Sequence, residues 1–282
     1  MAEFLKALGD YTFLQNALAA VFLSAVAAGI VGSFVVVRRI TYLAGGIAHC
    51  VLGGMGAVQY IKSGYDIPWL TPLHGALIAA VLAAVLVGAV SLKAKEREDT
   101  VISGLWAIGM AGGILFLAAA PGYNQNLMSF LLGNILMVSR TDLWFLAGLD
   151  LAVLIIVLID YKQLFAVCFD EEFARTRGIN TGFHYLLLLS LIAVTVVLLV
   201  TVVGVVMVIA LLSLPAATAS RFTKTLPVMI IVSMLLTATE SVSGLAISYG
   251  PDLPAGAIIV LLAGLVYISV VGTTTILKGF KY

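Results

Sequence analysis

The chain has 282 residues, of which 62% are hydrophobic and 10% are charged, and its mean hydropathy is +1.15. Soluble domains carry about 25% charged residues, so the composition excludes an ordinary soluble protein and predicts one that crosses a membrane several times. The net charge of +1 gives no basis for nucleic-acid binding. The two cysteines, Cys50 and Cys168, provide no disulfide framework, and the N-terminal residues lack the basic segment of a cleaved signal peptide.

Apolar segments long enough to cross a bilayer recur along the chain. A crossing helix needs about 20 apolar residues, and the expected spans are 13–37, 42–61, 70–92, 101–119, 143–161, 183–203, 205–219, 227–249 and 254–276. The segment 205–219 is short and contains Pro215, so we expect a broken or partial span there. The segment 127–138 is too short to cross and is expected to form a half-helix at one face. The predicted fold is all-α, with eight or nine transmembrane helices in a single domain over 1–282.

The basic residues indicate how the chain is oriented in the membrane. If the N-terminus lies outside, only Lys6, Lys62 and Arg140 of the 15 basic residues fall on the outer side. The Arg38–Arg39 pair and the lysines at the C-terminal end then fall inside. Because basic residues concentrate on the cytoplasmic side of membrane proteins, the pattern predicts an outer N-terminus and a cytoplasmic C-terminus.

The segment 168–182, CFDEEFARTRGINTG, is a charged insert between two apolar runs. Acidic residues in its first turn suit a helix start, with Asp170 as the cap, and Gly178 suits the position just beyond a helix end. We expect a short self-capped helix in the cytoplasm; the alternative is a solvated loop that merely follows the positive-inside rule. No cytoplasmic loop is long enough for a nucleotide fold and no Walker-type loop occurs, so any energy from ATP would come from another chain.

Motifs along the chain resemble one known family. FDEEFARTRGIN resembles the coupling segment of the zinc/manganese-type metal-ion permeases of bacterial ABC transporters, the ABC-3 family. Five further stretches are similar to the family patterns in the same order. They are RRITYLAGGIAHCVLGG (38–54), REDT (97–100), LMSFLLGNILMVSRTDL (127–143), VGVVMVIALLSLPAATA (203–219) and SYGPDLPAGAIIVL (248–261).

The resemblance implies a BtuC-like type II ABC importer architecture in the bacterial cell (inner) membrane, in which this chain is a transport subunit and not an enzyme. It implies a second copy of the chain, two ATPase subunits that use ATP, and an extracellular or periplasmic metal-binding protein. The transported ion would be zinc, manganese or iron, with Zn²⁺ or Mn²⁺ favoured, and no cofactor would be bound permanently. The ATPase would dock on 168–182 through Asp170, Glu171, Glu172, Phe173, Arg175, Arg177 and Gly178.

His49 is an ionisable residue inside an expected span. Its spacing places it on one helix face with Gly45, Gly53 and Gly56, and glycines allow another backbone to approach closely. One interpretation is a packing seam in which the histidine bonds a neighbouring carbonyl. The other is a neutral imidazole ligand on the translocation path, which the family resemblance favours.

Glu240 is the second such residue, and Ser233, Thr237 and Gly244 share its face of the 227–249 span. Intramembrane carboxylates are costly and mark functional sites by default, although a structural carboxyl is the alternative. Histidine with carboxylate suits Mn²⁺ or Zn²⁺. Asp252 matches the family aspartate in an outer turn and could attract cations at the entrance, but it is also ordinary turn chemistry.

The chain departs from the family pattern at position 45. The family usually has an aspartate four residues before the histidine, and this chain has Gly45 there. A metal would then be held more loosely, by His49 with Glu240 or with water, or His49 would only line the path.

Three functions are compatible with these features. The leading hypothesis is the membrane subunit of an ATP-driven importer of divalent metal ions. One alternative is an ABC permease for a metal chelate such as cobalamin or a siderophore complex. Another is an ion-coupled secondary transporter that uses His49 and Glu240 as a relay.

Overall fold

The computed structural model describes residues 2–65, 67, 69–93, 98–120, 133, 135–205, 207–251 and 253–279. Every regular element in these ranges is a helix. Eight helices are long and apolar enough to cross a membrane. They are α2 (Thr12–Arg38), α3 (Thr41–Tyr65), α4 (Pro72–Lys93), α5 (Glu98–Ala119), α7 (Arg140–Phe169), α9 (Thr181–Val203), α11 (Leu226–Tyr249) and α12 (Ala255–Gly279). The shorter elements are α1 (Ala2–Asp10), η1 (Ile135–Met137), α8 (Glu171–Thr176) and α10 (Val208–Ala219).

The predicted spans are confirmed, and the partial one is α10. At 12 residues, α10 is about 18 Å long, which is too short for a hydrocarbon core of about 30 Å. Pro215 lies inside α10 and does not end it. The predicted half-helix at 127–138 lies largely outside the described residues, where only η1 and its neighbours are seen.

The N-terminal helix α1 lies before the first span expected from the sequence. Phe4 is buried in the core, and its ring packs edge-on against Tyr249 at the end of α11, with 5.9 Å between the ring centroids. The apolar face of α1 therefore packs against the end of the helix bundle.

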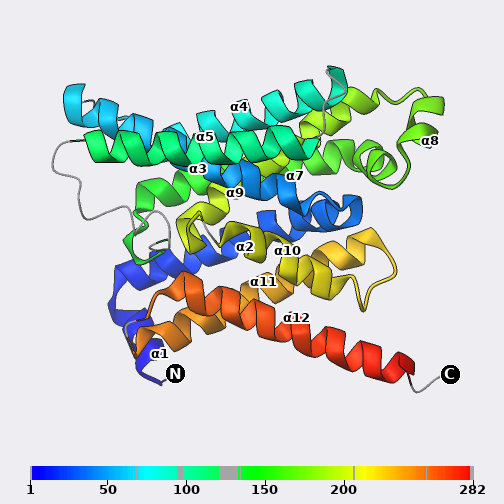
Figure 1. Ribbon diagram of the computed structural model, residues 1–282. Helices are drawn as coiled ribbons and strands as arrows, with labels where there is room; N and C mark the ends of the chain where they lie inside the picture. Colours follow the sequence, from blue (N-terminus) through cyan, green and yellow to red (C-terminus); the bar gives the residue numbers. More distant parts are fainter. Residues whose placement is uncertain are drawn as a thin grey trace.

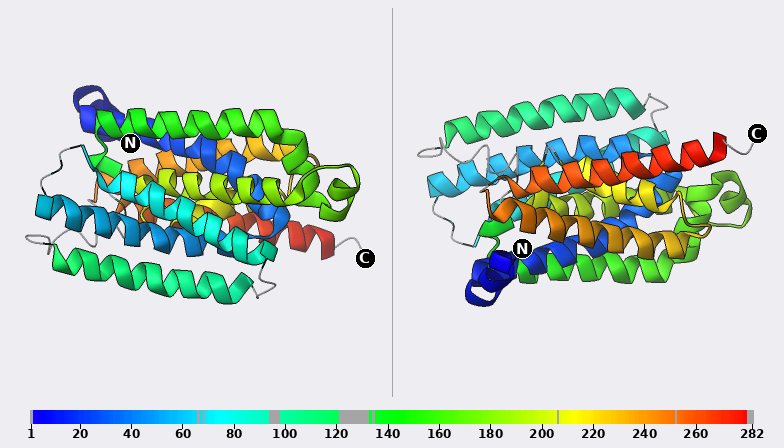
Figure 2. Two further views of the ribbon diagram at one scale, coloured as in Figure 1. Left: turned by 90° about the horizontal axis from the view of Figure 1, so that it is seen from above. Right: turned by 90° about the horizontal axis from the view of Figure 1, so that it is seen from below.

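The long helices lie side by side, with the two termini at opposite ends of the bundle (Figure 1). Helices α2, α3 and α9 form the interior: 72% of the apolar window of each is buried, compared with 17% for α5 and α12. Figure 2 shows α5 and α7 on opposite flanks. Because most of α5 and α12 is uncovered within one chain, these helices face lipid or another protein.

Close helix crossings at glycines hold α3 in the centre. A methyl group at Gly53 would lie 2.9 Å from the carbonyl oxygen of Gly109 on α5, and one at Gly56 would lie 2.7 Å from that of Gly113. On another face of α3, Gly54 meets Gly75 of α4 backbone to backbone. Small residues permit such approaches between membrane helices, so the glycines of α3 fix its distance from both neighbours.

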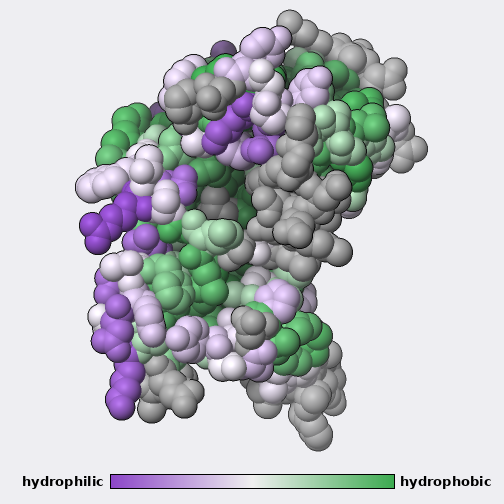
Figure 3. Space-filling model, turned by 90° about the vertical axis from the view of Figure 1, so that its left-hand side faces the viewer, coloured by the Kyte–Doolittle hydropathy of each residue, from purple (hydrophilic) through white to green (hydrophobic). Residues whose placement is uncertain are grey.

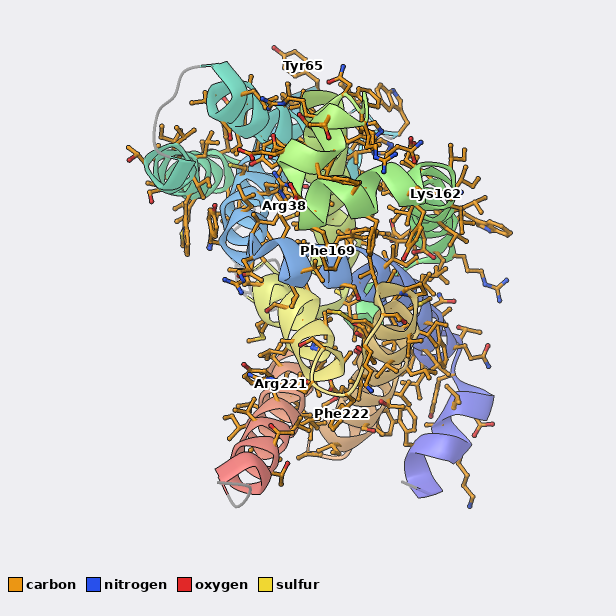
Figure 4. The ribbon with its side chains drawn as sticks, turned by 90° about the vertical axis from the view of Figure 1, so that its right-hand side faces the viewer. Arg38, Tyr65, Lys162, Phe169, Arg221 and Phe222 are labelled. Carbon is orange, nitrogen blue, oxygen red and sulfur yellow. The ribbon has the colours of Figure 1, made fainter. Side chains whose placement is uncertain are left out.

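The two ends of the bundle differ in their side chains. Figure 4 faces the end that carries α8, where Arg38, Lys162 and Arg221 gather. Figure 3 looks onto the opposite end, where hydrophilic residues lie along the left margin and in the upper part of the face, and hydrophobic residues show in its middle. The basic end is the one that the positive-inside rule assigns to the cytoplasm.

Candidate metal path and coupling helix

The charged insert forms α8, and its first turn is capped as the sequence predicts. The side chain of Asp170 accepts a hydrogen bond from the backbone N–H of Phe173 at 2.9 Å. Glu171 and Glu172 occupy the first turn, where acidic side chains interact favourably with the helix dipole. Asp170 also ends α7, so one residue separates the membrane helix from α8.

The last turn of α8 closes on Gly178 in the left-handed conformation, at φ 78°. The N–H of Gly178 donates to the carbonyl of Arg175 at 3.0 Å, and that of Ile179 donates to Ala174 at 3.1 Å. This pair of bonds is the Schellman arrangement. Hydrogen bonds within the segment therefore fix both ends of α8. They give this six-residue helix a defined start and end.

The exposed surface formed by α8 and the end of α7 combines aromatic and basic groups. Phe169 and Phe173 are 60% and 51% exposed, and Figure 4 shows Phe169 at this end of the bundle. The guanidinium of Arg177 lies 5.1 Å from the centroid of the Phe173 ring. Glu171 pairs with Arg38 of α2 at 3.0 Å and with Arg175 at 3.6 Å. Aromatic residues and arginine are enriched at protein interfaces.

His49 is buried between helices and stacks on an aromatic ring. Its imidazole lies parallel to the indole of Trp106 on α5, with centroids 4.5 Å apart and planes 13° apart. The side chain is 7% exposed, and its Nδ1 atom has no hydrogen-bond partner among the described residues. A neutral imidazole with a free nitrogen is able to bind a transition metal.

The position of the family aspartate is closed by apolar side chains. A methyl group at Gly45 would lie 2.6 Å from Cδ1 of Ile209 on α10 and 3.9 Å from the Trp106 ring. Beside Trp106, a depression of about 470 Å³ runs along α5, lined by Ser103, Trp106, Ala107, Met110, Ala111 and Ile114. The surroundings of His49 are thus apolar on the side where the family places a carboxylate.

Glu240 is buried in α11, and both of its carboxylate oxygens lack a partner among the described residues. Ser233, Thr237 and Gly244 are buried on the same helix. The hydroxyl of Thr237 donates to the carbonyl of Ser233 at 2.9 Å, so it is engaged within α11. A carboxyl in this position needs a proton, a cation or water, since leaving it charged and unpaired in apolar surroundings is costly.

The fold does not gather the candidate ligands into one compact cluster. Within the described ranges, no three histidine, cysteine, aspartate or glutamate side chains are close enough to hold a metal together. Helix α10 contacts α3, which carries His49, and α11, which carries Glu240. Asp252 lies outside the described residues. His49 and Glu240 therefore lie on two different helices that both contact α10.

One buried carboxylate is absent from the sequence-based candidates. Asp150 of α7 is 8% exposed, its Oδ1 atom lacks a partner in the described part of the chain, and its carboxyl faces the backbone at Ala27 of α2. The signal was available, because the expected span 143–161 contains it and an acid in a span is a candidate by default.

A bundle of membrane-length helices that buries a histidine and carboxylates has the construction of a transport permease. The comparison with protein families gives the particular kind. The model of the ABC 3 transport family matches residues 10–273, and the chain belongs to this family.

Individual relatives cover nearly the whole chain. It is 41% identical to the "Probable metal transport system membrane protein" of Chlamydia muridarum, over 90% of this chain and 86% of that one. It is 36% identical to the manganese transport system membrane protein MntC of Halalkalibacterium halodurans, over 94% and 88% of the two chains. Among solved structures, PsaBC from Streptococcus pneumoniae in complex with Fab matches with a TM-score of 0.84 at 32% identity, over 95% and 94% of the two chains. The predicted family and fold are thereby confirmed.

Proposed function

We propose that this chain is the permease subunit of an ATP-driven importer of divalent transition metal ions, with Mn²⁺ as the first candidate and Zn²⁺ as the second. The observation that carries the proposal is the pair of buried side chains, His49 and Glu240, whose ligand atoms lack partners inside a permease of this family. Relatives named for manganese and metal transport support the free ion over a chelate.

The two residues act in succession along the path. His49 offers one imidazole nitrogen, and Glu240 offers a carboxylate on a different helix. Water or backbone oxygens complete the coordination at each point, which suits Mn²⁺ because this ion accepts oxygen ligands. Sparse coordination favours release, as transport requires. Asp252 attracts cations at the outer entrance.

The energy comes from a separate pair of ATPase subunits that dock on the segment 168–182. The contact is the exposed surface of α8 and its C-terminal cap, with Phe173, Arg175 and Arg177. A second copy of this chain completes the permease in the bacterial inner membrane, with the N-terminus outside. An extracellular or periplasmic protein delivers the ion.

Uptake of radioactive Mn²⁺ tests this proposal in cells that lack their own importer and carry the permease with its ATPase and binding protein. Glu240→Gln keeps the size of the side chain and removes its charge. We expect uptake to fall about tenfold, equal to about 1.4 kcal/mol. The control is Asp10→Asn at an exposed carboxylate, which should behave as the unmodified chain. Unchanged uptake in Glu240→Gln would exclude its role, and uptake of a chelate without the free ion would favour the chelate permease.

A further inference from the structure

Arg38 is the last residue of α2, and the chain turns sharply after it. Arg39 adopts the left-handed conformation, at φ 62° and ψ 37°, and is the only non-glycine residue with positive φ in the described ranges. The N–H of Ile40 donates to the carbonyl of Val35 at 3.1 Å, and α3 begins at Thr41. The position of Arg38 is therefore set by the end of α2 and the start of α3.

The guanidinium of Arg38 joins three other helices. Nη1 donates to the carbonyl of Val167 in the last turn of α7, and Nη2 lies 3.0 Å from Oε2 of Glu171 in the first turn of α8. The Cζ atom lies 4.9 Å from the centroid of the Tyr185 ring on α9. The planar guanidinium allows all three contacts at once, which the point charge of a lysine does not.

An arginine that merely followed the positive-inside rule would be solvated. The neighbouring Arg39 is exposed in this way, whereas the side chain of Arg38 is 17% exposed. The carbonyl of Val167 also belongs to the last four of α7, which have no partner within the helix. Arg38 thus provides a hydrogen-bond donor to a carbonyl at the end of α7 and an ion-pair partner to the first turn of α8.

Close packing links α2 to the helices that carry both candidate ligands. A methyl group at Gly29 would lie 2.6 Å from the backbone nitrogen of Met234 on α11, and Gly32 meets the carbonyl of Leu212 on α10. Helix α11 carries Glu240, and α3, which carries His49, starts directly after the turn. Close-packed interiors transmit small shifts because they leave no room to absorb them.

We propose that Arg38 is a positioning residue that ties α8 to the core, so that movement of α8 by the ATPase displaces α2, and with it α10, α11 and the start of α3. The role rests on the proposed function, since it requires an ATPase on α8. Without the contact, α8 would lose its tie to α2, and ATP would be hydrolysed with little transport.

The test is the amount of Mn²⁺ moved per ATP hydrolysed by the full complex of permease, ATPase and binding protein in liposomes. Arg38→Lys keeps the charge and loses the three-way contact. We expect this ratio to fall about fivefold or more, the lower end of coupling between distant sites, while the ATPase still co-purifies with the permease. Arg39→Lys is the matched control and should keep the normal ratio.

Glu171→Gln removes the charge of the other partner in the same ion pair. This variant provides the test if the complex with Arg38→Lys does not assemble. If the Arg38–Glu171 ion pair transmits the movement, the double variant should be no worse than the more severe single variant, because both single variants already disrupt that pair. Equal ratios in Arg38→Lys and Arg39→Lys would overturn the role, as would loss of ATPase binding in Arg38→Lys, which would make it a docking residue. An unmodified complex that hydrolyses ATP without moving Mn²⁺ would overturn the proposed function and the role of Arg38 with it.

Discussion

The side chain of His49 packs against an aromatic ring, and the residue one turn before it is not a carboxylate. Its ring stacks on Trp106, and the neighbouring turn presents Gly45 packed near Ile209. A metal ion at this point would meet one imidazole nitrogen without a carboxylate one turn away. Glu240 and Asp150 add buried carboxylates on other helices, and their unpartnered oxygens are expensive to keep in an apolar interior.

Restoring the family aspartate should tighten the hold on the ion. In Gly45→Asp the new side chain displaces the flexible end of Ile209 and stands four residues from His49. We expect the KM for Mn²⁺ uptake to fall about fivefold, equal to about 1 kcal/mol, and the maximal rate to fall because release is slower. Uptake kinetics measure both. Gly45→Asn matches the size without the charge, so equal effects in the two variants would refute a ligand role for the carboxylate.

Among the elements, α3 depends most on close approach to its neighbours. It crosses α4 where Gly54 and Gly75 meet, and its other glycines approach α5. Helix α8 shows the opposite principle, because its own caps define it locally. Pattern and capping therefore predict where both helices lie in the sequence, while the backbone contacts of α3 exist only in the folded bundle.

Gly75→Ala should destabilise the α3–α4 crossing. The added methyl would overlap the carbonyl oxygen of Gly54 and would lie 2.6 Å from Cγ2 of Val58. Overpacking of this kind costs about 1–3 kcal/mol, so thermal unfolding in detergent, followed by tryptophan fluorescence, should occur at lower temperature. Gly112→Ala on α5 is the control, since that position is open and alanine favours the helix by about 1 kcal/mol. Equal unfolding temperatures for the two variants would show that the crossing tolerates the methyl.

For the whole molecule, the distribution of charge sets the expected orientation in the membrane. Arg38, Lys162 and Arg221 lie at the α8 end (Figure 4), and the N-terminus lies at the other (Figure 1). This arrangement predicts that α8 meets the cytoplasm, where ATPase subunits are available.

Labelling of single introduced cysteines tests the orientation in intact cells. Asp10→Cys and Thr225→Cys are exposed at opposite ends of the bundle, and the native Cys50 and Cys168 are buried. We expect a membrane-impermeant maleimide to label Asp10→Cys from outside and Thr225→Cys only after the cells are opened. The unmodified chain is the control for background. The reverse labelling pattern would show that the N-terminus lies in the cytoplasm and α8 lies outside.

The sequence by itself determined the positions of the membrane helices and the ends of α8. Each membrane helix satisfies its own backbone hydrogen bonds, so length and hydropathy suffice, and the caps of α8 lie within a few residues of it. Hydropathy does not order the helices in the bundle, because lipid tails are as apolar as leucine side chains.

Only the tertiary structure decided which helices are interior, that His49 stacks on Trp106, and that Arg38 reaches Glu171 across 133 residues of sequence. These contacts come from close packing between distant segments, for which a single sequence has no local signal. The same packing places the contact between Arg38 and Glu171 at the end of α2.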